Sequence, residues 1–213
     1  YSFLDDSFMK NYPKRIVYNG VDLDVFKPTE GDLRKKYSLE GKKVVLGVAS
    51  VWSERKGLDV FAELSERLPN DYKIVLVGTN EHVEKELPES ILCVSRTENR
   101  QALAQWYSTA DVFVNPTREE VLGLVNLESL ACGTPVVTFN VGGSPECLDE
   151  TCGAVVECDD IESLERAIKR VCCDNTFTSE NCVRRAQLFE METLFKEYIE
   201  LYDEMTLELK MKE

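Results

Sequence analysis

Apolar residues occur along this chain in two patterns, as short continuous runs and as stretches with helical spacing. The runs predict strands, because a strand covered on both faces carries few polar residues. They lie at residues 44–49, 73–77, 91–94, 111–115, 135–139 and 153–157. Helical spacing predicts helices between most of them, at residues 57–68, 99–109, 124–132 and 161–171. This alternation predicts an α/β fold, a doubly wound Rossmann-like parallel sheet with helices on both faces.

The two ends of the chain depart from this alternation. Residues 16–20 predict a short strand and a turn, so we interpret residues 1–30 as a connector and residues 31–189 as the main domain. Beyond residue 171 the pattern is helical, and the last helix, within residues 190–213, carries an apolar stripe. The stripe consists of Leu194, Phe195, Tyr198, Leu201, Tyr202 and Met205. A stripe of this size predicts that the last helix packs on a partner surface.

Composition limits the classes of function. The 213 residues are 43% hydrophobic, which suffices for a buried core. The net charge of −14 disfavours binding to nucleic acid, so any phosphate site has to be local. No stretch has the pattern of a signal peptide or a membrane span, which predicts a cytoplasmic protein. A leader before residue 1 is an alternative that stays open.

Eight cysteines and one histidine bear on the chemistry. The cysteines follow no CxxC pattern and several lie in apolar contexts, so we expect reduced thiols. Zinc bound by Cys147, Cys152 and Cys158 is the alternative, although their spacing is irregular. Because His82 is the one histidine and lies in a polar segment, a Ser–His–Asp triad cannot be assembled.

Two glutamates mark the most informative stretch of the chain. Glu120 follows the predicted strand at 111–115, and Glu128 lies in the next predicted helix. The first would sit at the carboxyl edge of the parallel sheet and the second about a turn and a half into the helix, so both can face one cleft. Carboxylates accept hydrogen bonds from sugar hydroxyls. The alternative is that both are solvated residues near a helix start, where acids complement the dipole.

Groups suited to phosphate lie nearby in the sequence. The backbone amides of Gly123, Leu124 and Val125 begin the predicted helix and lack partners within it. Arg55 and Lys56 stand at another helix start, where cations oppose the dipole unless an anion binds. The alternative is that both side chains reach out to solvent or pair with Glu54. Since these amides and cations can neutralise a diphosphate, we expect no metal and no other cofactor.

Two further loops follow strands on the same edge of the predicted sheet. Gly142 and Gly143 permit a close backbone approach to a ligand. Arg96 lies in a loop whose groups could meet a nucleobase. Neither loop has the glycine spacing of a dinucleotide-binding fingerprint or of a P-loop. Taken singly, each also fits an ordinary turn.

Six blocks of sequence, taken in order, resemble the retaining glycosyltransferases of family 4. The blocks are Asn19–Asp22 with Phe26–Pro28, Arg55–Gly57, Ala110–Pro116, Glu120–Glu128, Ala131–Val137 and Gly142–Glu146. Members of this family have the GT-B architecture, in which two Rossmann-like domains face each other across a cleft. The blocks resemble the C-terminal, nucleotide-sugar-binding domain. The resemblance therefore implies a missing N-terminal, acceptor-binding domain on which the last helix packs.

The resemblance also implies a role for each matching residue. Lys56 would bind the donor diphosphate, Glu120 the transferred sugar and Glu128 the ribose hydroxyls, with the helix-start amides on the phosphates. Two positions depart from the family pattern. Val51 stands where an arginine is usual, and Val121–Leu122 stands where Gly-Phe is usual.

The implied activity is transfer of a hexosyl group, with retention, from a nucleoside diphosphate sugar, for which we expect UDP. The acceptor would be a glycan or a lipid-linked glycan in polysaccharide synthesis, reached at the inner membrane surface through the missing domain. The chain alone would then be inactive. A non-catalytic, nucleotide-binding regulatory module with the same fold is the alternative. A sugar-nucleotide epimerase or a phosphorylase relative is a further one, although an epimerase needs an acid and base pair that the sequence does not show.

Overall fold

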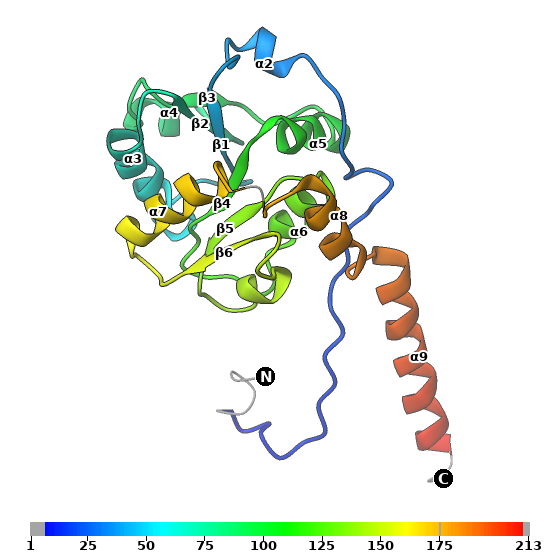
Figure 1. Ribbon diagram of the computed structural model, residues 1–213. Helices are drawn as coiled ribbons and strands as arrows, with labels where there is room; N and C mark the ends of the chain where they lie inside the picture. Colours follow the sequence, from blue (N-terminus) through cyan, green and yellow to red (C-terminus); the bar gives the residue numbers. More distant parts are fainter. Residues whose placement is uncertain (1–6, 175, 211–213) are drawn as a thin grey trace.

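The computed structural model describes residues 7–174 and 176–210 (Figure 1). Its centre is a six-stranded sheet in the order β3-β2-β1-β4-β5-β6, in which every neighbouring pair is parallel. The strands are β1 (Lys43–Val48), β2 (Tyr72–Val77), β3 (Leu92–Val94), β4 (Val112–Asn115), β5 (Val136–Phe139) and β6 (Gly153–Val156). The predicted parallel sheet is therefore confirmed.

Helices cover both faces of the sheet, as predicted. Figure 1 shows α3 (Leu58–Arg67), α4 (Glu81–Glu86) and α7 (Ile161–Val171) on one side, and α5 (Arg100–Thr109), α6 (Leu124–Ala131) and α8 (Ser179–Gln187) on the other. Residues of β1 alternate between the two cores, because successive side chains of a strand point to opposite faces. Val44 and Leu46 belong to the core beneath α5 and α6, and Val45 to the core beneath α3 and α7. Burial on both faces explains the continuous apolar runs.

Several short helical segments were not predicted from the sequence. They are α2 (Leu33–Lys36), α4 and the 3₁₀ helices η1 (Glu54–Lys56) and η2 (Ser144–Cys147). With three to six residues each, they are too short to show a helical period. The polar segment that contains His82 forms α4, and the His82 side chain is 84% exposed.

Residues 16–20 form no strand, contrary to the prediction. The chain instead makes one isolated parallel bridge at Val21, opposite Glu190. The Val21 amide donates to the Phe189 carbonyl (2.8 Å), and the Met191 amide donates to the Val21 carbonyl (3.0 Å). Because this pairing is made with the turn between α8 and the last helix, it cannot extend into a strand ladder.

The last helix, α9 (Met191–Lys210), extends away from the sheet (Figure 1). The segment before Val21 runs alongside it. The Tyr198 hydroxyl donates to the Val17 carbonyl (3.3 Å), and Arg15 pairs with Glu204 (3.0 Å). These two contacts hold the segment that enters the main domain beside α9.

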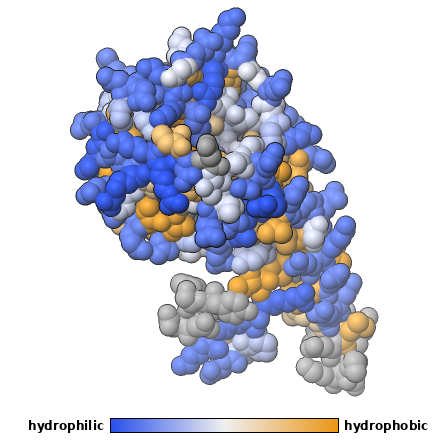
Figure 2. All heavy atoms as spheres, viewed as in Figure 1, coloured by the Kyte–Doolittle hydropathy of each residue, from blue (hydrophilic) through white to orange (hydrophobic). Residues whose placement is uncertain are grey.

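One face of α9 is apolar and open to water. Phe195, Ile199, Tyr202 and Met205 are 49%, 61%, 67% and 54% exposed, whereas Leu194 is buried against the domain. Figure 2 shows apolar atoms gathered where α9 leaves the domain. Within residues 7–174 and 176–210, no helix combines the length and the apolar character that a membrane crossing requires.

Candidate functional site

The strand order places a crevice at the carboxyl ends of β1 and β4. The chain adds β2 and β3 on one side of β1 and then returns to add β4, β5 and β6 on the other. The connections after β1 and β4 therefore lead in opposite directions, which opens a gap between their loops. Ligands of open parallel sheets bind at such a switch point. The sequence placed Glu120 at this edge.

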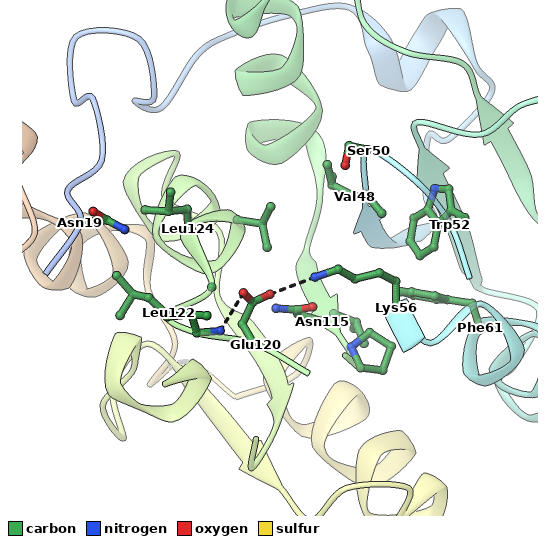
Figure 3. A pocket seen from close by; sticks show the side chains of 16 residues that line it. Asn19, Val48, Ser50, Trp52, Lys56, Phe61, Asn115, Glu120, Leu122 and Leu124 are labelled. Carbon is green, nitrogen blue, oxygen red and sulfur yellow. Dashed lines mark hydrogen bonds and ion pairs between the residues drawn. The ribbon is translucent and has the colours of Figure 1, made fainter. Parts of the chain in front are cut away.

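A cavity of about 290 Å³ lies at this point (Figure 3). Its lining comes from the ends of β1 and β4, from Lys56 and from residues 120–125. Lys56 Nζ lies 3.1 Å from Glu120 Oε2, and these side chains are 28% and 18% exposed. Glu120 Oε1 accepts a hydrogen bond from the Val121 amide (3.1 Å). Since an ammonium has three protons, Lys56 can hold Glu120 and bind an anion as well.

Lys56 is positioned by a contact between its turn and the loop after β4. It ends η1, and Gly57 follows in the left-handed conformation with φ of 76°. A β-carbon at Gly57 would lie 2.5 Å from the Pro116 carbonyl oxygen, so the position requires glycine. The Arg118 amide donates to the Arg55 carbonyl (2.9 Å). The loops that carry Lys56 and Glu120 are thus fastened together.

Arg118 adds a charged link between the same loops. Its guanidinium donates to both carboxylate oxygens of Asp59 (2.9 and 2.7 Å), to Asp159 (2.9 Å) and to the Glu54 carbonyl. The hydrogen bonds from Arg118 lower the pKa of Asp59. A bidentate arginine fixes geometry as well as charge. Sequence reasoning missed Arg118 because Asp59 and Asp159 are distant along the chain.

The start of α6 supplies open backbone amides. Gly123 precedes it in the left-handed conformation (φ 81°), and no side chain caps the helix. The amides of Leu124 and Val125 therefore lack helical partners, and both residues line the cavity. The helix dipole adds partial positive charge at this end. The structure thus places the predicted phosphate-binding amides beside Lys56 and Glu120.

A buried polar network lies behind that turn. The Asn126 side-chain amide donates to the Ser144 hydroxyl (3.0 Å) and accepts from Asn115 (2.9 Å), while the Thr138 and Ser144 hydroxyls lie 3.0 Å apart. The four side chains are at most 6% exposed. They join β4, α6, β5 and η2, so they fix the turn at Gly123. Sequence reasoning missed this network, whose signal was an asparagine within an otherwise apolar part of the helix.

A second cavity, of about 590 Å³, adjoins the first. Both are lined by Val48, Ala49, Ser50 and Val125. Glu128 lines the second cavity and not the first, because it lies about one helical turn further along α6 than Leu124. Arg96 lines the same cavity as Glu128. The two predicted glutamates therefore face neighbouring cavities of one crevice.

Glu128 has an unusual electrostatic environment. Burial raises its pKa to about 7, although a hydrogen bond from the Tyr107 hydroxyl (3.0 Å) and the charge of Arg100 favour the ionised form. Tyr107 is itself completely buried, and burial raises its pKa as well. A carboxyl group held in this way can accept hydrogen bonds from ligand hydroxyls without a protein cation in direct contact.

Gly142 and Gly143 contact the site differently from the prediction. They line neither cavity. A β-carbon at Gly142 would overlap the Glu120 carbonyl, and one at Gly143 would overlap the Val121 carbonyl. The close backbone approach that these glycines permit is therefore made to the Glu120 loop, which they support from outside the cavity.

Arg55 also differs from its predicted place. It pairs with Glu119 at 3.4 Å, and the two side chains are 59% and 70% exposed, outside both cavities. Val51, at the position where the family pattern has an arginine, is 72% exposed and lines neither cavity. Among the residues that the structure describes, Lys56 is consequently the one cation in the lining of the first cavity.

The cysteines offer no metal site within the described ranges. Cys147 and Cys152 are buried, whereas Cys158 is exposed. The Cys147 thiol lies 2.8 Å from the Leu122 carbonyl, and burial raises its pKa to about 12, which disfavours the thiolate that zinc needs. No group of three or more histidine, cysteine, aspartate or glutamate side chains in the described residues could hold a metal ion.

The fold and the crevice define a Rossmann-like domain of the GT-B type. The family of glycosyl transferases group 1 matches residues 42–174, so the chain belongs to this family. The D-inositol 3-phosphate glycosyltransferase of Mycobacteroides abscessus is 32% identical over 167 residues. That match covers 72% of this chain and 38% of the relative, so the chain spans well under half of the relative's length.

Solved structures agree on the fold. The sucrose-phosphate synthase of Thermosynechococcus elongatus superposes with a TM-score of 0.83 at 26% identity, covering 97% of this chain and 56% of its own. HepE of Anabaena, solved with UDP and glucose, has a TM-score of 0.79 at 21% identity. The match covers 89% of this chain and 57% of that protein, and at this identity it shows the fold alone.

Proposed function

We propose that this chain is the donor-binding half of a retaining glycosyltransferase of family 4. The complete enzyme would move a hexosyl group from a nucleoside diphosphate sugar to a hydroxyl acceptor in polysaccharide or glycoconjugate synthesis. The observation that carries the proposal is one crevice that joins Lys56 and Glu120, at the open amides of α6, with Glu128 in the adjoining cavity. Membership of the glycosyl transferases group 1 supports it.

The chemical problem in such a transfer is the departure of the diphosphate while positive charge grows at the anomeric carbon. Lys56 and the amides of Leu124 and Val125 would stabilise the leaving group, since they supply fixed N–H donors where negative charge develops. Glu120 would orient the sugar by accepting hydroxyl protons. The leaving phosphate can take the acceptor proton on the same face of the sugar, so the proposal requires no protein nucleophile.

For the donor we propose UDP as the nucleotide, with Glu128 on the ribose hydroxyls and Arg96 near the base. HepE, whose fold this chain shares, was solved with UDP and with UDP-glucose, which supports that choice. No metal enters the proposal, because the helix-start amides and Lys56 can offset the charge of the diphosphate.

The acceptor would bind to a part of the protein that this chain does not contain. The chain spans 38% of the M. abscessus relative, and α9 carries an open apolar face beside the point where the chain enters the domain. We propose that an N-terminal domain covers that face and completes the cleft with a glycan or lipid-linked acceptor. The chain alone would then bind donor without transferring sugar.

Calorimetric titration of the chain with UDP, GDP and ADP tests the proposal. At least one should bind, and Glu128→Ala should weaken that binding by about 1 to 3 kcal/mol, the usual loss when a buried hydrogen-bonding partner is removed. Glu119→Ala is the matched control, because Glu119 is exposed and lines neither cavity. Absence of binding by all three nucleotides, or equal affinity in the Glu128→Ala variant, contradicts the proposal.

A non-catalytic nucleotide-binding module is the second candidate. It is favoured by the position of Val51 and Arg55 outside the first cavity, which leaves Lys56 as the one cation lining it among the described residues. The full-length protein decides between the two. Turnover of a nucleoside diphosphate sugar, lost in a Lys56→Ala variant, identifies an enzyme, whereas nucleotide binding without turnover identifies the module.

A further inference from the structure

Asn19 lies at the rim of the first cavity, although it is about a hundred residues before Glu120 in the sequence. It belongs to the segment that enters the domain and not to the sheet or its loops. In Figure 3 its side chain lies beside Leu124, across the cavity from Lys56. The cavity that holds the Lys56–Glu120 pair is therefore partly built by the entry segment.

The backbone around Asn19 is fixed on both sides. Before it, the Tyr18 hydroxyl donates to Glu146 (2.5 Å), and the Tyr18 ring packs edge-on against Phe189 at 5.5 Å. After it, a β-carbon at Gly20 would overlap the backbone of Met191, so the chain there lies directly against the first residue of α9. An exposed side chain held between two such anchors has a defined position at the cavity rim.

The Asn19 carboxamide makes no hydrogen bond to the residues that the structure describes. Its oxygen can accept and its NH₂ can donate. Of the other polar side chains in the lining, Lys56 and Glu120 pair with each other, whereas the exposed Ser50 hydroxyl also makes no hydrogen bond to the described residues. Asn19 thus provides a neutral donor and acceptor that remain available to a ligand.

This chemistry matches a sugar hydroxyl better than a phosphate. A phosphate oxygen only accepts, and it would place negative charge against the carboxamide oxygen, whereas a hydroxyl can both donate and accept. Resting on the proposed function, we infer that Asn19 contacts a hydroxyl of the transferred hexose and contributes to the choice of donor sugar. Glu120 then accepts from the sugar, and Asn19 supplies the neutral donor that Glu120 cannot.

The test compares nucleotide affinity with nucleotide-sugar affinity in the whole chain. UDP, GDP and ADP, together with their glucose conjugates and with UDP-galactose and GDP-mannose, are titrated into wild type and Asn19→Ala. Asn19→Ala should lose about tenfold in affinity for the best nucleotide sugar, as expected for one or two lost hydrogen bonds, and should bind the free nucleotide within about twofold of wild type. Asn11→Ala, on the same segment and in neither cavity, should leave both affinities unchanged.

The outcomes separate this inference from the proposed function. If wild type binds none of the nucleotides, the proposed function fails. If nucleotides bind and Asn19→Ala leaves nucleotide-sugar affinity unchanged, the contact with the hexose is refuted. An equal loss for nucleotide and nucleotide sugar also refutes it, because the side chain would then contact the diphosphate. Thermal unfolding midpoints of both variants that match wild type show that the fold is retained.

Discussion

At the scale of single residues, Glu120 and Glu128 show how environment separates two identical carboxyl groups. Glu120 accepts from the Lys56 ammonium at 3.1 Å and from the Val121 amide at 3.1 Å. Glu128 has a tyrosine hydroxyl as its close partner, and burial raises its pKa to about 7. Near neutral pH, Glu128 therefore changes between an acceptor and a donor of hydrogen bonds, and proton binding there is linked to stability.

Glu128→Gln should remove this pH dependence. Because the folded-state pKa of about 7 lies above the ordinary 4.5, the contribution of Glu128 to stability is complete below pH 4.5 and is lost as the pH rises through 7. The free energy of unfolding of wild type, relative to Glu128→Gln, should therefore fall by about 2 to 3 kcal/mol between pH 5 and pH 8, at about 1.4 kcal/mol per pKa unit. Urea unfolding at stepped pH measures it. A difference that stays constant with pH contradicts the prediction.

At the scale of elements, the site depends on loops that hold one another. The loop after β4 carries Glu120 and is fixed by Arg118 on one side and by Gly142 and Gly143 on the other. Behind it, the network around Asn126 fixes the start of α6. A substitution in a supporting loop should therefore change binding in the cavity, although it replaces no residue that lines the cavity.

Gly142→Ala tests that support, and Gly41→Ala is its matched control. Both glycines have positive φ, 54° and 71°, so each alanine meets the left-handed penalty of about 1 to 2 kcal/mol. At Gly41 a β-carbon has nothing within 4 Å, whereas at Gly142 it overlaps the Glu120 carbonyl. We expect Gly142→Ala to cost more stability than Gly41→Ala and to weaken nucleotide binding about tenfold or more. Equal unfolding midpoints and equal affinities in the two variants would show that the glycine loop does not support Glu120.

The strands could be predicted from the sequence, whereas the contacts between distant loops could not. Strands buried on both faces, such as β1 and β2, leave a continuous apolar run, and all six were predicted. Parallel strands put their ends on one edge, which located Lys56 and Glu120. Contacts between distant loops leave no periodic trace, so the Arg118 link, the Asn126 network and the outward side chain of Arg55 came only with the structure.

At the scale of the whole molecule, the charged cavity and the exposed apolar surface suit different kinds of partner. The net charge of −14 repels nucleic acid in bulk, while Lys56 and the start of α6 line one cavity, where we propose that an anion binds. The open face of α9 is the opposite kind of surface, since it is apolar and lies beside the entry of the chain. Faces of this kind are commonly covered by another protein surface.

If an N-terminal domain covers that face, substitutions there should affect the complete protein and not the isolated chain. Tyr202 is 67% exposed, so Tyr202→Glu should change the free energy of unfolding of this chain by no more than about 0.5 kcal/mol. In the full-length protein the same change places a carboxylate in the contact between domains, which should lower its unfolding temperature and its rate of sugar transfer. Glu200→Gln, at an exposed position off the apolar stripe, should alter neither. Calorimetry and a transfer assay, on the full-length protein and on this chain, measure these effects. If the full-length Tyr202→Glu variant is indistinguishable from wild type, the apolar face of α9 does not contact an N-terminal domain.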